Sequence, residues 1–319
     1  MKAVLEKIQK LGIVPVVVLN GVDEAVPVAK ALCDGGLPVA EVTFRTDAAE
    51  ESIRVIKQTF PHMLVGAGTV LTTDQAERAI AAGAEFIVSP GFNPTVVKYC
   101  IEKGVLITPG CNNPSAMESA LELGLDVVKF FPAEASGGLK AIKAMAAPYV
   151  NLKFMPTGGI NADNINEYLA YPRVIACGGS WMVSSDLVKN REFDRIAELT
   201  REAVMTVLGF ELKHIGINCE NEEEADRTTD FFDKAFGFTK KPGSTSVFAG
   251  SYVEAMKTPY LGARGHIAIG TNNIERAINY LDAVGVAVDR ETAKYKDGKM
   301  TTIYLKEEIS GFALHLLQK

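Results

Sequence analysis

The chain has 319 residues, of which 47% are hydrophobic and 23% are charged, proportions that are ordinary for a globular protein with a sizeable core. This length allows two domains, one of them large. The formal net charge is −6 and there is no basic cluster, so nucleic acid is not an expected partner, and no apolar run approaches the ~18 residues that would span a membrane.

Two further features bear on the cellular setting. Residues 1–11 form an amphipathic, charged stretch that lacks the long apolar core of a signal peptide. The five cysteines are scattered along the chain and lack the CxxC spacing of many metal sites. Because unpaired thiols are typical of reducing compartments, we expect a cytoplasmic protein.

Eight strand–helix pairs are predicted over the first 210 residues. Runs of β-branched residues that end in glycine or proline indicate the strands, and amphipathic segments indicate the helices. The expected strands are 13–19, 39–45, 64–70, 86–89, 106–108, 127–133, 153–157 and 174–177. The helices that follow them are expected at 23–34, 48–59, 72–82, 94–103, 114–123, 139–145, 162–170 and 186–208.

This alternation is typical of parallel βαβ units. Eight units in roughly 200 residues fit a closed (β/α)8 TIM barrel at the small end of its size range. An open doubly wound sheet is the alternative, but the first strand carries no GxGxxG and the glycine-rich turns come late in the chain. We therefore expect an α/β fold, with the barrel over residues 1–209.

Lys129 lies inside residues 127–133, Val-Val-Lys-Phe-Phe-Pro-Ala, which otherwise predict a buried strand. A buried ammonium group is unfavourable, and proteins rarely bury a lysine without a partner. Burial favours the neutral amine, which is the form that attacks a carbonyl carbon. The alternative is a lysine at a strand end whose side chain extends to water.

Polar groups and glycines also gather where barrel strands end, the usual place for active groups in this fold. Glu41, Thr43 and Arg45 alternate along the second strand and so share one face of it, which we expect to point inward. The alternative is that this face is exposed to solvent. Gly158-Gly159 follows the seventh strand and Gly178-Gly179 the eighth. Backbone N–H groups of such turns can close around a phosphate.

Six motifs span this region: 36–45 (Gly-Leu-Pro-Val-Ala-Glu-Val-Thr-Phe-Arg), 66–70 (Gly-Ala-Gly-Thr-Val), 89–91 (Ser-Pro-Gly), 129–134 (Lys-Phe-Phe-Pro-Ala-Glu), 156–159 (Pro-Thr-Gly-Gly) and 178–181 (Gly-Gly-Ser-Trp). Together and in this order they closely resemble the 2-keto-3-deoxy-6-phosphogluconate / 4-hydroxy-2-oxoglutarate aldolase family of class I aldolases. The resemblance covers residues 1–208. It implies a homotrimeric barrel that cleaves a 2-keto acid to pyruvate and an aldehyde.

The resemblance also implies roles for individual residues. Lys129 would form a Schiff base with the C2 carbonyl, and Glu41 would act as general base and acid. No metal or other cofactor is expected for this reaction. The substrate could be 2-keto-3-deoxy-6-phosphogluconate or 4-hydroxy-2-oxoglutarate, although Ser180 favours the first, which is phosphorylated. The implied substrate-binding residues are Arg45, Thr69, Pro90, Phe131, Thr157, Gly158, Gly159, Gly179 and Ser180.

Two other functions use the same groups. The barrel could bind a phosphorylated sugar without turnover, as a sensor. The same Schiff base could also decarboxylate a β-keto acid such as oxaloacetate. The presence of nucleophile, base, carboxylate-binding arginine and phosphate turns together argues against a pure sensor.

Residues 210–319 predict a different, α+β domain with an internal repeat. Lys-His-Ile-Gly-Ile at 213–217 and Gly-His-Ile-Ala-Ile at 265–269 each precede a helix. Three strands are expected after each helix, at 238–241, 246–249 and 252–256, and at 287–293, 301–305 and 312–317. Two such βαβββ units resemble the vicinal-oxygen-chelate superfamily, which includes glyoxalases and extradiol dioxygenases.

Three of the four histidines of the chain lie in this second domain. The resemblance implies that metal ligands come from the first and last strands of each unit, which are the positions of His214, Glu254, His266 and His315. Imidazole and carboxylate ligands suit iron, manganese, nickel or zinc, so a divalent metal is expected. Alternatively, the histidines are structural, and the domain is degenerate and serves assembly or ligand sensing.

Overall fold

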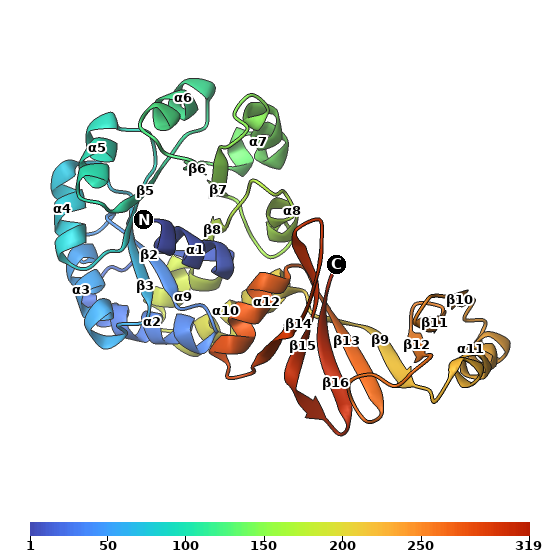
Figure 1. Ribbon diagram of the computed structural model, residues 1–319. Coiled ribbons are helices and arrows are strands. Elements are labelled where there is room, and N and C mark those ends of the chain that lie inside the picture. The colour runs from blue at the N-terminus through green and yellow to red at the C-terminus, as the bar shows by residue number, and fades with distance from the viewer. The chain divides into compact units, whose positions relative to one another are not determined.

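The computed structural model describes residues 1–319 and divides them into two compact units, Met1–Val207 and Leu208–Lys319 (Figure 1). We refer to them as unit 1 and unit 2. No helix in either unit has the length and apolar character needed to pass through a lipid bilayer.

Unit 1 alternates short strands with helices along the whole of its length. Its strands are β1 (Ile13–Val17), β2 (Val39–Thr43), β3 (Leu64–Gly68), β4 (Phe86–Ser89), β5 (Leu106–Pro109), β6 (Val127–Phe130), β7 (Lys153–Pro156) and β8 (Cys177–Gly179). Its helices are α1 (Lys2–Leu11), α2 (Ala25–Asp34), α3 (Ala49–Thr59), α4 (Thr73–Ala81), α5 (Pro94–Glu102), α6 (Pro114–Glu122), α7 (Gly138–Ala146), α8 (Ile165–Leu169), α9 (Ser185–Lys189) and α10 (Phe193–Leu208).

All strand pairs of unit 1 are parallel. Six strands pair in the order β5-β4-β3-β2-β1-β8, and β6 pairs with β7 in a second sheet. Single parallel bridges join Gly110 to Lys129 and Thr157 to Gly178, so β6 and β7 are linked to β5 and β8. Helices α2 to α8 lie outside the strands (Figure 1). This arrangement brings the carboxyl ends of the strands together.

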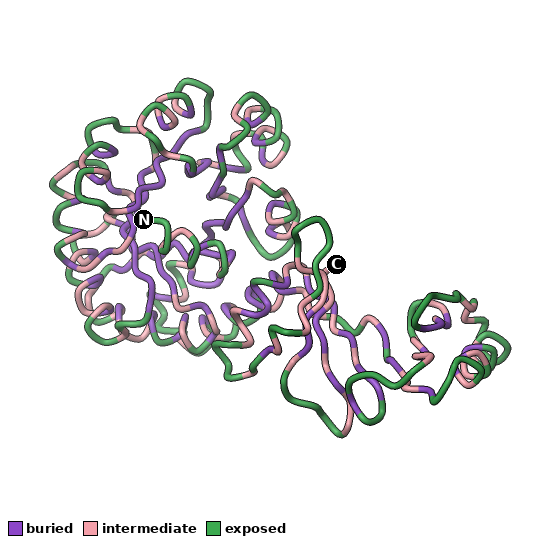
Figure 2. Tube along the Cα trace, viewed as in Figure 1, coloured by how far each residue is buried: buried purple, intermediate pink, exposed green.

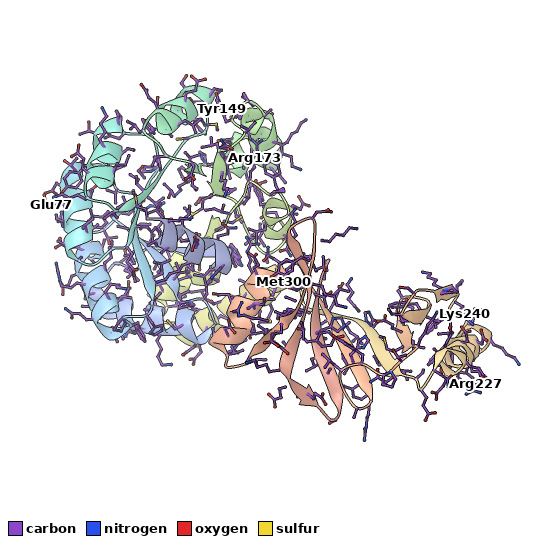
Figure 3. All side chains as sticks on the ribbon, in the orientation of Figure 1. Glu77, Tyr149, Arg173, Arg227, Lys240 and Met300 are labelled. Carbon is purple, nitrogen blue, oxygen red and sulfur yellow. The ribbon has the colours of Figure 1, made fainter.

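Burial explains why these segments are strands. Every residue of β1, β2 and β3 is buried, as expected for a parallel sheet that is covered on both faces. The helices are buried on one side only, which Figure 2 shows as alternating colours along their turns. Exposed charged side chains such as Glu77 of α4 extend outward (Figure 3).

Helix boundaries in unit 1 follow capping chemistry. The side chains of Thr72, Asn93 and Asn113 each accept a hydrogen bond from a backbone N–H in the first turn of the helix that follows. Proline occupies the first position of α5 and α6, where a missing N–H costs nothing.

Several predicted elements of unit 1 were wrong in extent. The strand predicted at 127–133 ends at Phe130, because Pro132 has no N–H and the N–H of Ala133 turns to donate to the Thr157 carbonyl. Lys129 is therefore near the strand's end, not in its middle. The last strand lies at Cys177–Gly179 and not at 174–177, because residues 177–179 pair with β1.

The single helix predicted at 186–208 is also wrong, since the structure has two helices there. Arg191 adopts a left-handed backbone conformation (φ 59°), which ends α9 before α10 begins at Phe193. The helix predicted at 162–170 is shorter, at Ile165–Leu169.

Unit 2 has one mixed sheet and two helices. Its elements are β9 (Glu211–Asn218), α11 (Glu222–Phe236), β10 (Lys240–Pro242), β11 (Ser246–Ala249), β12 (Val253–Met256), β13 (Gly265–Thr271), α12 (Ile274–Ala283), β14 (Val288–Lys296), β15 (Lys299–Ile309) and β16 (Phe312–Gln318). The order strand, helix, three strands thus occurs twice. The sheet order is β10-β11-β12-β9-β13-β16-β15-β14.

The centre of this sheet joins the first and last strands of both repeats. β9 is antiparallel to β13, while β12 is parallel to β9 and β16 is parallel to β13. His266 pairs with Gly216, and Ala268 lies between His214 and His315 in the register. The side chains of His214, Glu254, His266 and His315, from distant parts of the sequence, can therefore meet on one face of the sheet.

Candidate active site and candidate metal centre

Lys129 and Glu41 form a buried ion pair in unit 1. Lys129, near the end of β6, is 5% exposed, and Glu41, in β2, is fully buried. The Lys129 Nζ atom lies 3.4 Å from Glu41 Oε1. The other carboxylate oxygen, Oε2, is buried and has no hydrogen-bond partner, so it can accept a proton or a water. Because Lys129 is buried, its side chain does not extend to water.

Gly68 makes room for this carboxylate. A Cβ atom at position 68 would lie 2.2 Å from Glu41 Oε1, well inside van der Waals contact. The register of β2 and β3 places Gly68 opposite Thr43, two residues beyond Glu41. Sequence reasoning did not give Gly68 a role. The feature that could have indicated a role is the position of Gly68 in the glycine-rich end of the third strand, beside the strand that carries Glu41.

A cavity of about 220 Å³ opens beside this pair. Phe131 connects the two, because its ring centroid is 5.1 Å from Lys129 Nζ and its side chain also lines the cavity. The structure brings seven of the predicted substrate-binding residues to the cavity wall: Arg45, Phe131, Thr157, Gly158, Gly159, Gly179 and Ser180. Ser184 and Ser185, which the sequence analysis did not single out, line it as well.

Two predicted substrate-binding residues, Thr69 and Pro90, lie outside that lining, as do Lys129 and Glu41 themselves. Thr69 follows β3 and accepts a hydrogen bond from Arg45 Nε at 3.3 Å, so it orients a lining residue. Its backbone is left-handed (φ 56°), a strained conformation for a threonine that is frequent at functional sites. Pro90 is packed against Gly110, where a Cβ would meet the Pro90 carbonyl oxygen at 2.0 Å.

The residues after Lys129 support the glycine turn after β7. The N–H of Ala133 donates to the Thr157 carbonyl at 2.8 Å, and the N–H of Glu134 donates to the Gly158 carbonyl at 3.1 Å. Gly158 and Gly159 are left-handed (φ 99° and 82°), which favours glycine. Both glycines line the cavity wall, in a turn whose backbone can approach an anion closely.

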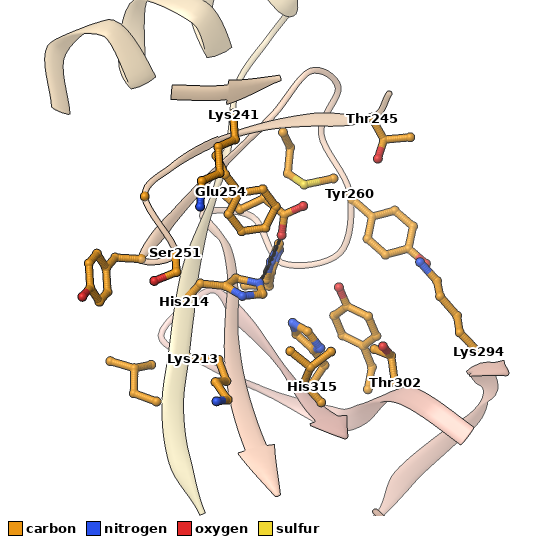
Figure 4. Close-up of a pocket in the computed structure, with 18 of the residues that line it drawn as sticks. Lys213, His214, Lys241, Thr245, Ser251, Glu254, Tyr260, Lys294, Thr302 and His315 are labelled. Carbon is orange, nitrogen blue, oxygen red and sulfur yellow. Dashed lines mark hydrogen bonds and ion pairs between the residues drawn. The ribbon is translucent and has the colours of Figure 1, made fainter. Parts of the chain in front are cut away.

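Unit 2 brings its three histidines together with one glutamate (Figure 4). His214, His266 and His315 are buried, and one ring nitrogen from each lies within 4.8 Å of the others. Glu254 Oε2 is 3.1 Å from the Nε2 atoms of both His214 and His266. Gly216 permits this approach, because a Cβ there would lie 2.0 Å from the His266 ring.

These four side chains fit a divalent metal ion. His266 Nδ1 and both nitrogens of His315 are buried and have no hydrogen-bond partner, which is costly unless another group binds them. Ser246 Oγ donates to Glu254 Oε1 at 2.6 Å and so orients the carboxylate. Three imidazoles and a carboxylate are ligands that suit iron, manganese, nickel or zinc.

Glu254 and His315 have the protonation states that metal binding requires. Burial by itself raises the pKa of the Glu254 carboxyl, but hydrogen bonds from His214, His266 and Ser246 outweigh it and hold that pKa well below its usual range. Burial, aided by the neighbouring His266 and His214, lowers the pKa of His315 to about 3. At neutral pH the carboxylate is therefore charged and the His315 imidazole is neutral, the forms that bind metals.

The cluster forms part of a cavity of about 850 Å³ in unit 2. Tyr304 is stacked on His315, with ring centroids 4.8 Å apart, and burial raises the pKa of its hydroxyl to about 12. Lys241 and Lys294 also line this cavity. The sequence analysis did not single out these three residues, because nothing in the local pattern distinguishes them from surface residues.

The comparisons with known proteins concern unit 1. The family model described as KDPG and KHG aldolase matches residues 4–199. A 2-dehydro-3-deoxy-phosphogluconate aldolase of Haemophilus influenzae is 50% identical over 201 residues, which are 63% of this chain and 95% of that protein. The enzyme of the same name from Treponema pallidum is 48% identical over 207 residues, 65% of this chain and 99% of that protein.

A solved structure is similar over the same region. It is the KDPG aldolase of Legionella pneumophila with pyruvate captured as a covalent carbinolamine. The TM-score is 0.60 at 38% sequence identity, covering 63% of this chain and 96% of that one. The family match ends at residue 199 and so assigns unit 2 to no family.

Proposed function

The chain belongs to the KDPG and KHG aldolase family and is an aldolase, a carbon–carbon lyase; from this we propose which substrates it cleaves and which residues act. The substrates are 2-keto-3-deoxy-6-phosphogluconate, cleaved to pyruvate and glyceraldehyde 3-phosphate, and 4-hydroxy-2-oxoglutarate, cleaved to pyruvate and glyoxylate. The observation that carries the assignment of residues is the buried pair of Lys129 and Glu41 beside a small cavity.

In this proposal Lys129 is the nucleophile. Its neutral amine attacks the C2 carbonyl, and loss of water from the carbinolamine gives a Schiff base. A base takes the proton of the C4 hydroxyl as the C3–C4 bond breaks, the bond's electron pair moves into the iminium to form an enamine, and the aldehyde leaves. Protonation of the enamine carbon and hydrolysis release pyruvate and regenerate Lys129. The amine supplies the electron sink, so these steps need no metal.

Glu41 moves the protons. Its Oε1 atom lies 3.4 Å from Lys129 Nζ, which is close enough to exchange a proton directly or through one water. Its unpartnered Oε2 atom supports the same role. Arg45 pairs with the substrate carboxylate through its planar guanidinium, held by its bond to Thr69. Phe131, Pro90 and Thr157 surround the pyruvyl end.

Gly158, Gly159, Gly179 and Ser180 hold the phosphate group of the larger substrate. The left-handed turn of Gly158 and Gly159 and the Ser180 residue on the same cavity wall support this assignment. They favour the phosphorylated substrate over 4-hydroxy-2-oxoglutarate. The glyoxylate part of 4-hydroxy-2-oxoglutarate would occupy the same aldehyde position.

Three further features belong to the same proposal. The bridges at Gly110–Lys129 and Thr157–Gly178 support one closed (β/α)8 barrel formed by β1 to β8. The barrel domain ends near residue 209, and the family resemblance supports a homotrimer. The five cysteines are free and four are buried, which supports a reducing, cytoplasmic setting.

Borohydride trapping tests the nucleophile. The protein is mixed with pyruvate, reduced, and analysed by intact mass and peptide mapping. A pyruvyl adduct confined to the peptide that contains Lys129 is expected. An adduct on another lysine, or no adduct while cleavage proceeds, would remove Lys129 from the mechanism.

For unit 2 we propose a divalent metal site formed by His214, Glu254, His266 and His315, in two βαβββ repeats of the vicinal-oxygen-chelate type. The three buried imidazole nitrogens without partners support it. A bound metal would act there as a Lewis acid toward an oxygen ligand. Metal analysis after exhaustive dialysis should find about one ion per chain, and a metal-free protein that binds no added zinc, cobalt or manganese would refute the site.

A further inference from the structure

The ligand set of unit 2 determines the charge of its site, given the metal site proposed above. Three neutral imidazoles and one carboxylate balance only one of the two charges of a divalent ion. The loaded site therefore keeps a charge of about +1, whereas a second carboxylate in place of His315 would have made it neutral. A site of this charge favours an anionic ligand over a neutral one.

Lysines on the cavity wall add to this charge. Lys213 is paired with Glu211, which also pairs with Lys319. Neither Lys241 nor Lys294 forms an ion pair with a carboxylate, and Lys294 lies over the Tyr260 ring at 6.0 Å. The only carboxylates in the lining are Glu211 and Glu254. In a chain whose net charge is −6, this cavity is a local concentration of positive charge.

The two unpaired lysines come from opposite ends of the sheet. Lys241 is in β10 and Lys294 is in β14, which are the first and last strands in the sheet order. Both line the cavity that contains the histidines, so the sheet curves around it. Figure 4 shows Lys294 next to Tyr260 and away from His214 and His315.

We propose that the unit 2 cavity binds a small acid with two anionic groups. One is a carboxylate that would bind the metal, and the other, a carboxylate or a phosphate, pairs with Lys241 or Lys294. The cavity volume of about 850 Å³ suits a small metabolite and leaves space between the metal and these lysines.

Cobalt-loaded protein tests the proposal with three related probes, because the visible spectrum of Co²⁺ reports only ligands that reach the metal. The probes are glycolamide, which is neutral, glycolate, which has one anionic group, and 2-phosphoglycolate, which has two. None has a ketone that could react with Lys129. Affinity should rise about tenfold or more at each step, as expected for added charge-assisted hydrogen bonds.

Lysine variants identify the second anionic contact. Lys241→Gln or Lys294→Gln should weaken 2-phosphoglycolate binding about tenfold and leave glycolate binding and cobalt content unchanged. Lys306→Gln, an exposed lysine outside the cavity, serves as the control. Unchanged phosphoglycolate affinity in both lysine variants, or glycolamide binding as tight as glycolate binding, overturns this inference alone. Failure to bind cobalt overturns the metal site and this inference with it.

Discussion

The two sites of the chain solve the problem of buried charge in opposite ways. In unit 1 a buried lysine faces a buried glutamate, so two charges of opposite sign lie 3.4 Å apart. In unit 2 a glutamate and three histidines converge, and no lysine or arginine pairs with Glu254. The first site is balanced by its own side chains. The second directs lone pairs at one point, an arrangement that a cation completes.

Replacing Lys129 should give the largest difference between the effects on unit 1 and on unit 2. Lys129→Ala should reduce cleavage by at least about 10⁴-fold, because no other group can form the Schiff base. Metal content should be unchanged. Initial rates, circular dichroism and metal analysis measure these effects, with the exposed Lys98→Ala as a matched control in the same unit. Cleavage that survives in Lys129→Ala would contradict a lysine-based mechanism.

Glu41→Gln keeps the size of the side chain and removes its acid–base function. Turnover should fall by about 10²- to 10⁴-fold, the usual contribution of a positioned general acid–base. Stopped-flow rates and the rate of borohydride trapping should both decrease, since Glu41 serves carbinolamine formation as well as enamine protonation. A variant that traps pyruvate slowly but cleaves at the normal rate would exclude this role.

Gly68→Ala tests the space beside Glu41. The added methyl group would displace the carboxylate, so cleavage should fall about ten- to a hundred-fold and stability by roughly 1–3 kcal/mol. Gly91→Ala is the matched control, because a Cβ there meets no atom within 4 Å. Kinetics and urea unfolding of both variants decide the matter. Equal behaviour of the two would mean that the strand adjusts to the methyl group.

Chelation should have the smallest effect on cleavage, namely none. Removal of the metal should lower the stability of unit 2 by about 3–4 kcal/mol if the ion is present at 100–1,000 times its Kd. Calorimetry and an aldolase assay on the same EDTA-treated sample measure both quantities. If cleavage falls with chelation and returns with added metal, the two sites are coupled and the comparison above fails.

The motifs at strand ends made much of unit 1 predictable. The strand expected at 86–89 is confirmed as β4, and the Pro-Gly or capping residues around it explain why. What the sequence could not predict was the precise ends of the segments after Lys129 and before Phe193. There the boundary depends on tertiary hydrogen bonds such as Ala133 N–H to Thr157 O, and on the left-handed Arg191.

The site in unit 2 was predictable only in part, for a different reason. The internal repeat indicated His214 and His266, since both follow the first residue of matching motifs. Lys241, Lys294 and Tyr304 reach the cavity only because the sheet curves and its edge strands approach the same space. Local patterns contain no information on such curvature, so these residues became evident only in three dimensions.

The pairing of β9 with β13 has a consequence for how unit 2 can be inherited. Each half supplies two of the four proposed metal ligands, His214 with Glu254 and His266 with His315, and neither half has four. A gene that encoded one half would need two copies of its product to assemble the site. Joined in a single chain, the halves can carry different residues at matching strands, as Glu254 of β12 and His315 of β16 show. Selection then acts on both halves as one heritable unit.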